Sequence, residues 1–417
     1  MKYQGAKGTM DFLPETAELA YRLESSARGV FSRYGYKELR LPLLENMNLF
    51  LRGLGETTDI VQKQLFKIDG KDDLCLRPEG TAQAVRSCIE HNLFELNDRT
   101  KKLFYIGAMF RGERPQKGRL RQFHQMGAEA IGGRSPELDA EIIKTAYDIL
   151  TSFGLKHGEH FRLEINTLGS PEDKKGFEDS LRSKLASKRD SLCDVCKTRY
   201  DANILRVLDC KSPSCKEIVA GIEIDRAHIS DESRSYYARV LELLTSFGIQ
   251  GFKDDPMLVR GLDYYTHTVF EFTTTLLGAQ AAIGAGGRYD GLVAELGGQS
   301  TPCCGFGLGL ERIMLLFEGT TKESGITAFV AYAGENCFVK AFETVMTLRA
   351  NGISAEFDFT KSSLKSQLKY SQKLGASFVV IIGDDERASG TVALRDMSKS
   401  DQSVMPLADA VAIIKNN

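Results

Sequence analysis

The chain has 417 residues, of which 42% are hydrophobic and 26% are charged. This composition can bury a large core, so it excludes a globally disordered protein, and the length predicts two or three domains. Fifty-four Lys and Arg residues against 56 Asp and Glu residues give a formal net charge of −2. That balance excludes a generally basic coat for nucleic acid, but it leaves room for local basic patches.

The sequence contains no apolar run close to the roughly 20 residues that a membrane helix needs. The first residues lead into no apolar segment of the kind found in secretory signals. The chain carries nine cysteines, an odd number, which favours reduced thiols. We therefore expect a cytoplasmic, globular protein with no membrane association.

The first predicted element is an amphipathic helix over residues 14–35. Apolar side chains recur along it at helical spacing, and Gly35 follows as a stop signal. The recurring positions are Leu19, Leu23, Ala27, Val30 and Tyr34. One face of this helix is therefore expected to pack on a core.

Strand patterns follow the first helix. Leucines alternate with other residues over 39–43, which predicts a strand, and Pro42 places that strand at an edge. Further short apolar segments lie at 65–68, 74–76 and 103–110. Their irregular spacing favours a mostly antiparallel α+β core over a regular βαβ array.

A polar, helical and cysteine-bearing stretch over residues 170–255 interrupts this pattern and reads as an insertion. Ser170 is a good N-cap, and Pro171 is favoured in the first turn of a helix. Strand-like sequence resumes at 268–274, and a glycine-rich passage then leads to an apolar helix expected to begin near Gly305.

The C-terminal part predicts a separate small domain with a parallel sheet. Residues 326–333 and 353–359 read as strands around a helix. Residues 362–374 read as a helix, and 377–383 as a continuous buried strand. Helices alternating with β-rich runs are typical of an α/β domain.

Three segments outside the core pattern carry residues suited to chemistry. The first, Phe110–Phe123, has five basic residues and one acidic residue, and its turn residues predict a hairpin with a loop at 115–118. Its arginines could grip a polyphosphate or a carboxylate in a two-pronged manner, and Phe123 could stack on a base. The alternative is a solvated hairpin whose charges prevent its exposed strand edges from pairing with another chain.

The other two segments are Leu258–Thr266 and the glycine-rich pair Gly284–Gly291 and Gly305–Arg312. Arg260 lies between apolar residues, so it is expected to be buried and to need an anion, either a ligand or an internal carboxylate. The glycines permit close approach of the backbone to a ligand, or simply tight packing of helix on sheet. Neither glycine cluster matches a dinucleotide-binding or Walker-type phosphate loop.

Together these segments resemble the signature regions of class II aminoacyl-tRNA synthetases, and in detail the histidyl-tRNA synthetase family. The matching stretches are Pro42–Glu45 (end of motif 1, the dimer element), Leu76–Thr81 (amino-acid loop), Phe110–Arg114 with Arg119–Gln125 (motif 2), Leu258–Tyr265 (the histidine-specific peptide), Gly305–Arg312 (motif 3) and Leu364–Gly383 (anticodon-binding domain). The resemblance covers nearly the whole chain and keeps the order of the family.

The resemblance implies an α+β, class II synthetase-like antiparallel sheet as the catalytic core, with a helical insertion and a C-terminal α/β anticodon-binding domain. On this basis residues 1–169 and 256–325 form the core, 170–255 the insertion and 326–417 the anticodon-binding domain. The implied activity is that of a histidine–tRNA ligase. It would activate L-histidine with ATP to histidyl-adenylate and pyrophosphate, then transfer histidine to the 3′ end of tRNA(His). Mg²⁺ bridging the phosphates, and a homodimer, are also implied.

The family's functional residues map onto this chain residue by residue. Arg260 and Arg111 are the implied catalytic residues. The implied histidine-binding residues are Glu79, Gly80, Thr81, Arg111, Gln125, Glu129, Arg260, Tyr264 and Tyr265. The implied ATP-binding residues are Arg111, Glu113, Arg119, Phe123 and Arg312.

Cysteines 193, 196, 210 and 215 are spaced C-x2-C, thirteen residues, C-x4-C. Such spacing is able to form a tetrahedral zinc site in a reducing compartment. Residues 199–211, however, also read as a structural helix followed by a turn, and the resemblance implies no general metal requirement in this insertion. We therefore assign no metal from the sequence and leave the role of these cysteines open.

Two other functions compete with the ligase. A synthetase-like regulatory subunit of histidine biosynthesis would typically lack the anticodon-binding domain and lose catalytic arginines, whereas this chain has Arg111, Arg260, Arg312 and a C-terminal domain. A sister synthetase for proline or threonine would share the architecture, but the peptide at 258–265 argues against it.

Overall fold

The structure is a computed structural model, and it describes residues 3–55, 58, 60–70, 72–93, 100–278, 282–317, 325–360, 362–399 and 401–416. The chain folds as two compact units, Met1–Gly319 and Thr320–Asn417. Among the helices of these described ranges, none combines the length and the apolar composition needed to cross a membrane.

The larger unit is built on an eight-stranded sheet. Its strands are β1 (Lys37–Glu38), β5 (Lys101–Phe110), β6 (Gln122–Ile131), β7 (Arg162–Thr167), β8 (Lys253–Asp254), β9 (Thr266–Thr273), β10 (Ala282–Arg288) and β11 (Cys303–Gly309). Their order is β1-β5-β6-β11-β10-β9-β7-β8. Neighbours are antiparallel except at the two ends, where β1 pairs parallel with β5 and β7 with β8. The predicted α+β core with a mostly antiparallel sheet is confirmed.

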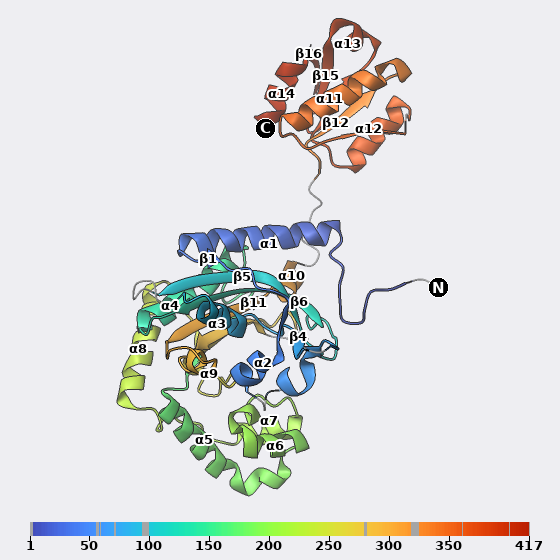
Figure 1. The fold of residues 1–417 in the computed structure, drawn as a ribbon. Coiled ribbons are helices and arrows are strands. Elements are labelled where there is room, and N and C mark those ends of the chain that lie inside the picture. The colour runs from blue at the N-terminus through green and yellow to red at the C-terminus, as the bar shows by residue number, and fades with distance from the viewer. Residues whose placement is uncertain are drawn as a thin grey trace. The chain divides into compact units, whose positions relative to one another are not determined.

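Three long helices pack on one face of this sheet and enclose the main core: α1 (Pro14–Arg33), α4 (Pro136–Ser152) and α8 (Asp231–Ser246). Helix α1 runs along the sheet in Figure 1, and its predicted apolar positions are buried except for Tyr34, which is half-buried. Phe31 of α1 stacks on Phe104 of β5 with ring centroids 4.4 Å apart. The predicted helix is confirmed, and Gly35 after it has the positive φ of +80° that glycine adopts without strain.

The opposite face carries shorter elements. Helices α2 (Met47–Leu54), α3 (Thr81–Glu90) and α9 (Leu292–Glu295) cover part of it, beside a small sheet of β2 (Leu44–Asn46), β4 (Leu74–Leu76) and β3 (Phe66–Lys67) and the π-helical turn η1 (Ile60–Gln64). These elements share a second hydrophobic core with a further helical segment. That segment consists of α5 (Pro171–Leu185), α6 (Asp194–Ala202) and α7 (Pro213–Ala220), with the 3₁₀ turns η2 (Ala186–Ser191) and η3 (Ile204–Val207). The predicted N-cap at Ser170 is present as a full capping box with Asp173.

Three local predictions were wrong. Residues 39–43 form no strand, because the carbonyls of Leu41 and Pro42 accept hydrogen bonds from the Arg77 side chain instead of from a neighbouring strand. Gly305 lies inside strand β11, and helix α10 (Leu310–Met314) begins five residues later, followed by η4 (Leu315–Phe317). The helix expected over 199–211 lies earlier, at α6, and gives way to η3.

The smaller unit has its own core around a five-stranded sheet of order β13-β12-β14-β15-β16, in which β12 is Ala328–Tyr332, β13 Ala355–Phe357, β14 Phe378–Ile382, β15 Thr391–Asp396 and β16 Asp401–Pro406. The helices are α11 (Phe338–Ala350), preceded by η5 (Glu335–Cys337), α12 (Leu364–Lys373), α13 (Asp384–Ser389) and α14 (Leu407–Lys415). The first three strands are parallel, as predicted, but β15 and β16 add an antiparallel hairpin. The sheet is therefore mixed rather than purely parallel.

Candidate active site

A cavity of about 760 Å³ opens in the larger unit, on the face of the sheet opposite α1. Strand β6 shows why its floor is polar. Phe123 and Gln125 line the cavity, while Met126 and Ala128 lie in the apolar core on the other face. Successive side chains of a strand point to opposite faces, so one strand supplies both the core and the floor of the site.

Most of the site residues implied by sequence meet around this cavity. The lining includes Glu79, Thr81, Arg111, Glu113, Arg119, Phe123, Gln125, Arg260, Tyr264, Tyr265 and Arg312. Two others do not line it. Gly80 precedes the first turn of α3, and Glu129 lies behind Thr81, fully buried.

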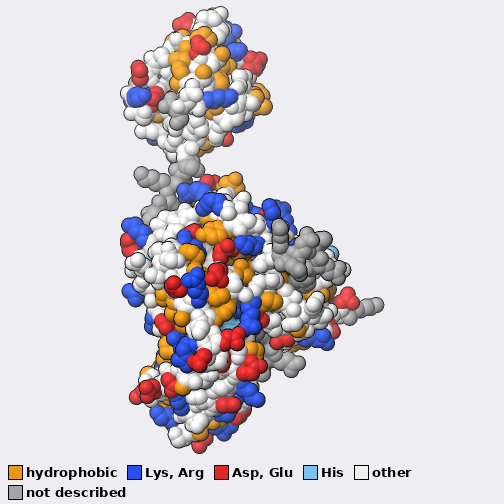
Figure 2. Space-filling model, turned by 90° about the vertical axis from the view of Figure 1, so that its left-hand side faces the viewer, with side chains coloured by type: hydrophobic (Ala, Val, Ile, Leu, Met, Phe, Trp, Pro, Cys, Tyr) orange, Lys and Arg blue, Asp and Glu red, His pale blue; other side chains and the backbone are white. Residues whose placement is uncertain are grey.

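The lining carries an excess of positive charge. Among the described residues it contains seven Arg or Lys side chains against five Asp or Glu side chains. Four of the arginines, at 111, 119, 260 and 312, come from three separate segments of the chain. Figure 2, by contrast, shows basic and acidic side chains interspersed over the face it draws. Since the whole chain has a formal net charge of −2, the basic excess is a local property of the cavity, and it suits a polyanionic ligand.

The hairpin of β5 and β6 presents Arg111 at its loop end, directly after the last residue of β5. The Nε atom of Arg111 donates to the carbonyl of Pro78 at 2.9 Å, and its guanidinium lies 5.2 Å from the centroid of the Phe123 ring. Glu113 and Arg119 form an ion pair across the loop, which is closed by a bridge between Gln116 and Arg119. The predicted hairpin loop at 115–118 is confirmed, and its charges face the cavity rather than solvent alone.

Arg312 is fixed by backbone carbonyls. Its Nε donates to Gly118 at 2.8 Å and its Nη1 to Ala282 at 2.6 Å. Burial, followed by repulsion from Arg111 and Arg119, lowers the pKa of Arg312 to about 10. A guanidinium held among other cations is stabilised by an incoming anion more than an isolated one would be.

Arg260 has an internal partner and also lines the cavity. Its Nη1 donates to Oε1 of Glu271 at 2.9 Å, and both side chains are 20% exposed. Burial opposes the charge, but the ion pair with Glu271 raises the pKa of Arg260. The Nε atom of Arg260 is buried and receives no acceptor from the described residues. Both sequence interpretations, an internal ion pair and a cation presented to a ligand, are therefore compatible with its position.

Glu79 stabilises the start of α3. Its carboxylate accepts from the backbone N–H of Thr81 at 2.6 Å and of Ala82 at 2.9 Å. Burial raises the pKa of Glu79, although these bonds and Arg111 favour its charged form. Gly80 is required here by space, because a Cβ atom at this position would lie 2.3 Å from the ring of Tyr105. Glu79 therefore reaches the cavity from a rigid helix end.

Glu129 sits in a closed hydrogen-bonded cluster. Its Oε1 accepts from the Thr81 hydroxyl at 2.8 Å and the Tyr105 hydroxyl at 3.0 Å, and its Oε2 accepts from Tyr289. Burial raises the pKa of Glu129 to about 8. Strand β11 leaves room for it with Gly305, whose Cβ, if present, would lie 1.8 Å from Oε2. The glycine thus makes space for a carboxylate of the protein itself.

The remaining acceptors and aromatic walls lie beside this cluster. The Oε1 atom of Gln125 is buried, and no described residue donates a hydrogen bond to it. Tyr264 and Tyr265 are almost fully buried, with ring centroids 4.6 Å apart. Burial raises the pKa of both hydroxyls, that of Tyr265 to about 12. At neutral pH both therefore keep their protons and can donate them.

Sequence reasoning missed several residues around the site. Glu271, the partner of Arg260, is an acid within the apolar run Val269–Phe272, a signal that could have been noticed. Tyr105 and Tyr289, which hold Glu129, gave no local signal. Arg206, from the turn after α6, lines the cavity and donates to the Gly261 carbonyl at 2.6 Å.

Comparison with known proteins follows the same division into two parts. A family model described as histidyl-tRNA synthetase matches residues 8–313, and a model described as anticodon binding domain matches residues 327–417. A histidine–tRNA ligase from Moorella thermoacetica is 45% identical over 411 residues, which is 97% of this chain and 96% of the relative. Another, from Trichlorobacter lovleyi, is 42% identical over 98% of this chain and 97% of its own length.

Solved structures with this fold include two informative neighbours. The crystal structure of apo histidyl-tRNA synthetase from S. aureus is 32% identical, with a TM-score of 0.81 over 99% of this chain and 100% of that chain. A structure from Bacillus halodurans C, described as an ATP phosphoribosyltransferase regulatory subunit/histidyl-tRNA synthetase, is 21% identical, with a TM-score of 0.67 over 92% of this chain and 99% of that one. At that identity the second likeness shows the fold alone.

Proposed function

The chain belongs to the histidyl-tRNA synthetase family, and we propose that its cavity binds histidine and ATP side by side and joins them as histidyl-adenylate. Ligation of histidine to tRNA is the activity of this family and of this chain. ATP is a substrate of the enzyme class. The observation that carries the assignment of the cavity is the meeting of four arginines from three segments with buried acceptors suited to an amino acid.

The chemistry requires this mixture of charges. A carboxylate must attack the α-phosphorus of a triphosphate, and the two anions repel each other. Fixed cations reduce that repulsion and stabilise the extra charge on the pentacoordinate phosphorus, without taking part in bond formation. Pyrophosphate leaves, and the 3′ ribose hydroxyl of the tRNA then attacks the acyl carbon and displaces AMP.

In our proposal each cation has its own role. Arg111 holds the α-phosphate beside the substrate carboxylate, and Arg260 stabilises the charge that develops at the α-phosphorus. Arg312 binds the γ-phosphate end, and the adenine stacks between Phe123 and Arg312. The Glu113–Arg119 pair orders the hairpin loop over the nucleotide. The guanidinium of Arg111 lies over the Phe123 ring, 5.2 Å from its centroid. This contact supports the proposal that the two residues act together in holding ATP.

The amino acid would be held from the other end of the cavity. Glu79, Thr81 and Gln125 offer acceptors for its ammonium group. The buried Oε1 of Gln125, which accepts no hydrogen bond from the described residues, supports this role. The imidazole needs one partner for each ring nitrogen, which we assign to Glu129 and Tyr264, with Tyr265 as a wall. For Glu129 to take part, the Thr81 and Tyr105 hydroxyls must share its oxygen with the ligand or turn away.

Mg²⁺ would arrive with ATP as part of the substrate. A hard cation prefers carboxylate oxygens together with phosphate and water. Glu113, Glu271 and Glu311 place carboxylates in the lining, so the donor set fits such an ion. When bound, the ion would neutralise phosphate charge and orient the departing pyrophosphate.

We further propose that residues 326–417 read the anticodon and that residues 170–255 act as an insertion in the core formed by 1–169 and 256–325. The match of 327–417 to an anticodon binding domain supports the first assignment. Helix α8, although inside 170–255, packs against α4 and belongs to the same main core as α1. The insertion proper therefore covers α5 to α7.

Truncation tests this division of labour. A chain that ends at Gly325 should retain histidine-dependent ATP–pyrophosphate exchange, because every residue assigned to activation lies before that point. Charging of tRNA(His) should fall far more. Equal loss of both activities in a truncated protein with a normal circular dichroism spectrum would contradict the division.

A homodimer in the cytoplasm completes the proposal. Leu43 and Leu44, in the segment resembling the dimer element, are 46% and 48% exposed, which suits an interface. Light scattering on the purified chain measures the mass directly, and the double variant Leu43→Lys, Leu44→Lys should shift that mass to the mass of a monomer.

The cytoplasm is the compartment in which the charged tRNA is used, and cell fractionation tests whether the protein is found there.

The substrate assignment is tested by ATP–pyrophosphate exchange with histidine, proline and threonine measured separately. Only histidine should support exchange, because a pocket with partners for both ring nitrogens leaves buried polar groups unpaired when another side chain enters. Exchange with proline or threonine would indicate a sister synthetase. No exchange with any of the three, from a folded protein, would favour a regulatory role.

A further inference from the structure

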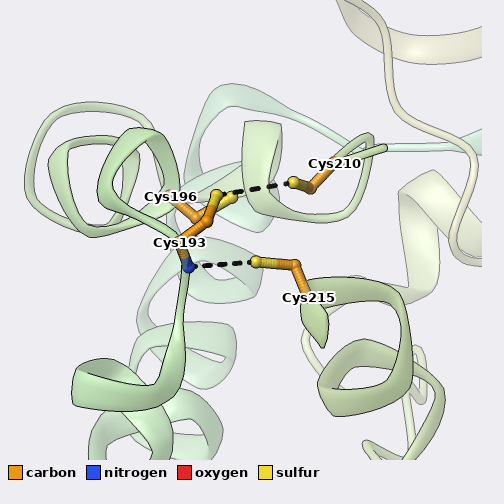
Figure 3. Close-up of side chains that lie close together, drawn as sticks. All are labelled: Cys193, Cys196, Cys210 and Cys215. Carbon is orange, nitrogen blue, oxygen red and sulfur yellow. Dashed lines mark hydrogen bonds between the residues drawn. The ribbon is translucent and has the colours of Figure 1, made fainter. Parts of the chain in front are cut away.

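The helical segment beside the cavity brings four cysteine side chains to one point. Cys193 precedes α6 and Cys196 lies in its first turn, Cys210 follows η3, and Cys215 lies in α7. Figure 3 shows the four side chains converging from these separate elements. Their sulfur atoms all lie within 4.8 Å of one another, and Cys196 and Cys215 are fully buried.

The spacing of the sulfurs matches a tetrahedral metal site. Zinc–sulfur bonds of about 2.3 Å place the corners of a tetrahedron roughly 3.8 Å apart. The sulfurs of Cys193 and Cys210 are 3.9 Å apart. A disulfide needs about 2.05 Å between its sulfurs, and four sulfurs converging on one centre do not divide into two separate pairs.

Backbone N–H groups are already directed at two of the sulfurs. The N–H of Cys193 donates to Sγ of Cys215 at 3.3 Å, and the N–H of Ser212 donates to Sγ of Cys210 at 3.5 Å. Such donors stabilise negative charge on sulfur, and groups of this kind around the ligands hold a metal site in shape. Thiolates buried without a cation would be costly, so a divalent ion is the natural partner of this arrangement.

We propose that Cys193, Cys196, Cys210 and Cys215 bind one zinc ion as a structural tetrathiolate site. Four protein ligands leave no open position, as is typical of structural rather than catalytic zinc. On binding, each cysteine contributes a thiolate and its proton leaves to solvent. The geometry thus favours the alternative that the sequence spacing left open.

The site would brace one wall of the active-site cavity. Between Cys196 and Cys210, Asn203 donates to a carboxylate oxygen of Asp263, and Arg206 donates to the Gly261 carbonyl at 2.6 Å. Both contacts reach the segment that carries Arg260. A zinc ion that closes the loop between residues 196 and 210 therefore fixes the support of this segment, although it touches no substrate.

Metal content of the full-length protein provides the direct test. Protein prepared with a thiol reductant and dialysed against metal-free buffer should contain close to one zinc per chain by inductively coupled plasma mass spectrometry. Cys196→Ser and Cys215→Ser should each lose the zinc. Cys337→Ser is the matched control, since Cys337 is a buried free cysteine in the smaller unit, and it should retain the zinc.

Cobalt substitution supplies a second readout that does not depend on the folding of any variant. Co²⁺ in this site should give a strong thiolate-to-metal charge-transfer band and the visible absorption of a tetrahedral complex. A wild-type chain without zinc, weak octahedral cobalt spectra, or zinc retained in both cysteine variants would overturn the proposal. Disulfides found by mass spectrometry after alkylation of freshly isolated, unreduced protein would also overturn it.

The consequence for the cavity rests on the proposed function. Removing zinc with a mercurial reagent and a chelator should speed tryptic cleavage at Lys197 and Lys211, and it should also lower histidine-dependent exchange. The two failures are distinguishable. A chain with zinc but no exchange would refute the proposed function alone, whereas full exchange from a chain without zinc would refute the structural site alone.

Discussion

Arg260 and Arg288 are both paired with a carboxylate on a strand or helix of the larger unit, yet their surroundings differ. Arg260 and its partner Glu271 are each 20% exposed at the wall of the cavity. Arg288 and its partner Asp139 are 0% and 1% exposed. The same pair of functional groups is therefore open to a ligand in one place and sealed in the other.

The use of the guanidinium donors separates the two more sharply. Arg288 donates from Nε to Asp139 at 2.9 Å and from Nη1 to the Gly133 carbonyl at 3.0 Å and to Asp290 at 2.9 Å. Arg260 has one hydrogen bond to Glu271, while its Nε faces no acceptor among the described residues. An arginine whose donors are fully used serves the fold, and one with an idle buried donor is suited to a ligand.

The largest effect is expected from Arg288→Ala, as a loss of stability. Removing one partner of a buried ion pair leaves Asp139 uncompensated and typically costs about 3–5 kcal/mol. Urea unfolding measures the change. Arg189→Ala is the control, because Arg189 pairs with Asp201 at the surface, where solvent screens such pairs and they contribute little to stability. Equal effects from both variants would remove the distinction between buried and exposed pairs.

Arg260→Ala should instead slow the chemistry. Loss of a preorganised cation at the transition state costs about 10²–10³ in rate, so single-turnover formation of histidyl-adenylate should fall by at least that order. Binding of ATP and histidine should weaken less. Arg260→Lys should recover only part of the rate, because an ammonium cannot make the planar two-pronged contact of a guanidinium.

Glu271→Gln serves as the companion variant to Arg260→Ala. It breaks the ion pair but keeps the arginine, so the rate should fall less than in Arg260→Ala while the melting temperature changes by a similar amount. A stable Arg260→Ala protein with near-normal adenylate formation would show that another residue supplies the cation. Loss of stability alone would return Arg260 to the structural class of Arg288.

Per pH unit, the smallest expected effect is a change in stability that originates at Glu129. Its pKa of about 8 in the fold lies above the ordinary value of about 4.3, so the folded chain keeps a proton that the unfolded chain loses. Between these values stability must fall as pH rises, by at most about 1.4 kcal/mol per pH unit for one proton. Above pH 8 this contribution levels off.

Unfolding free energies of the substrate-free protein at several pH values between 5 and 9 measure this slope. Glu129→Gln lacks the titrating group, so its slope should be shallower than that of the unmodified chain by the contribution of one proton. Identical slopes would mean that Glu129 is already ionised in the fold, and its hydroxyl donors would then have to stabilise a full charge.

Local patterns predicted much of this fold because their signals are strong. The helical repeat between Leu19 and Val30 and the cap at Ser170 fixed two helices within a few residues. The glycine-rich β11 was misread as the start of a helix, although Phe306 and Leu308 alternate with glycines at the period of a strand. Its place between β6 and β10 rests on long-range pairing, which no local window contains.

By itself the sequence determined the family, the order of the motifs and the residues offered to chemistry, since these depend on residue types at short spacing. Only the tertiary structure decided which arginine stays open, because Arg260 and Arg288 each lie next to a glycine in the sequence and differ in what the fold places around them. The space that Gly305 leaves for Glu129 depends on the register of β6 and β11, in which these two paired residues lie 176 positions apart in the chain. The convergence of the four cysteines likewise depends on how α6, η3 and α7 pack against one another. That packing results from burial of apolar side chains, and the spacing of the cysteines in the sequence does not determine it.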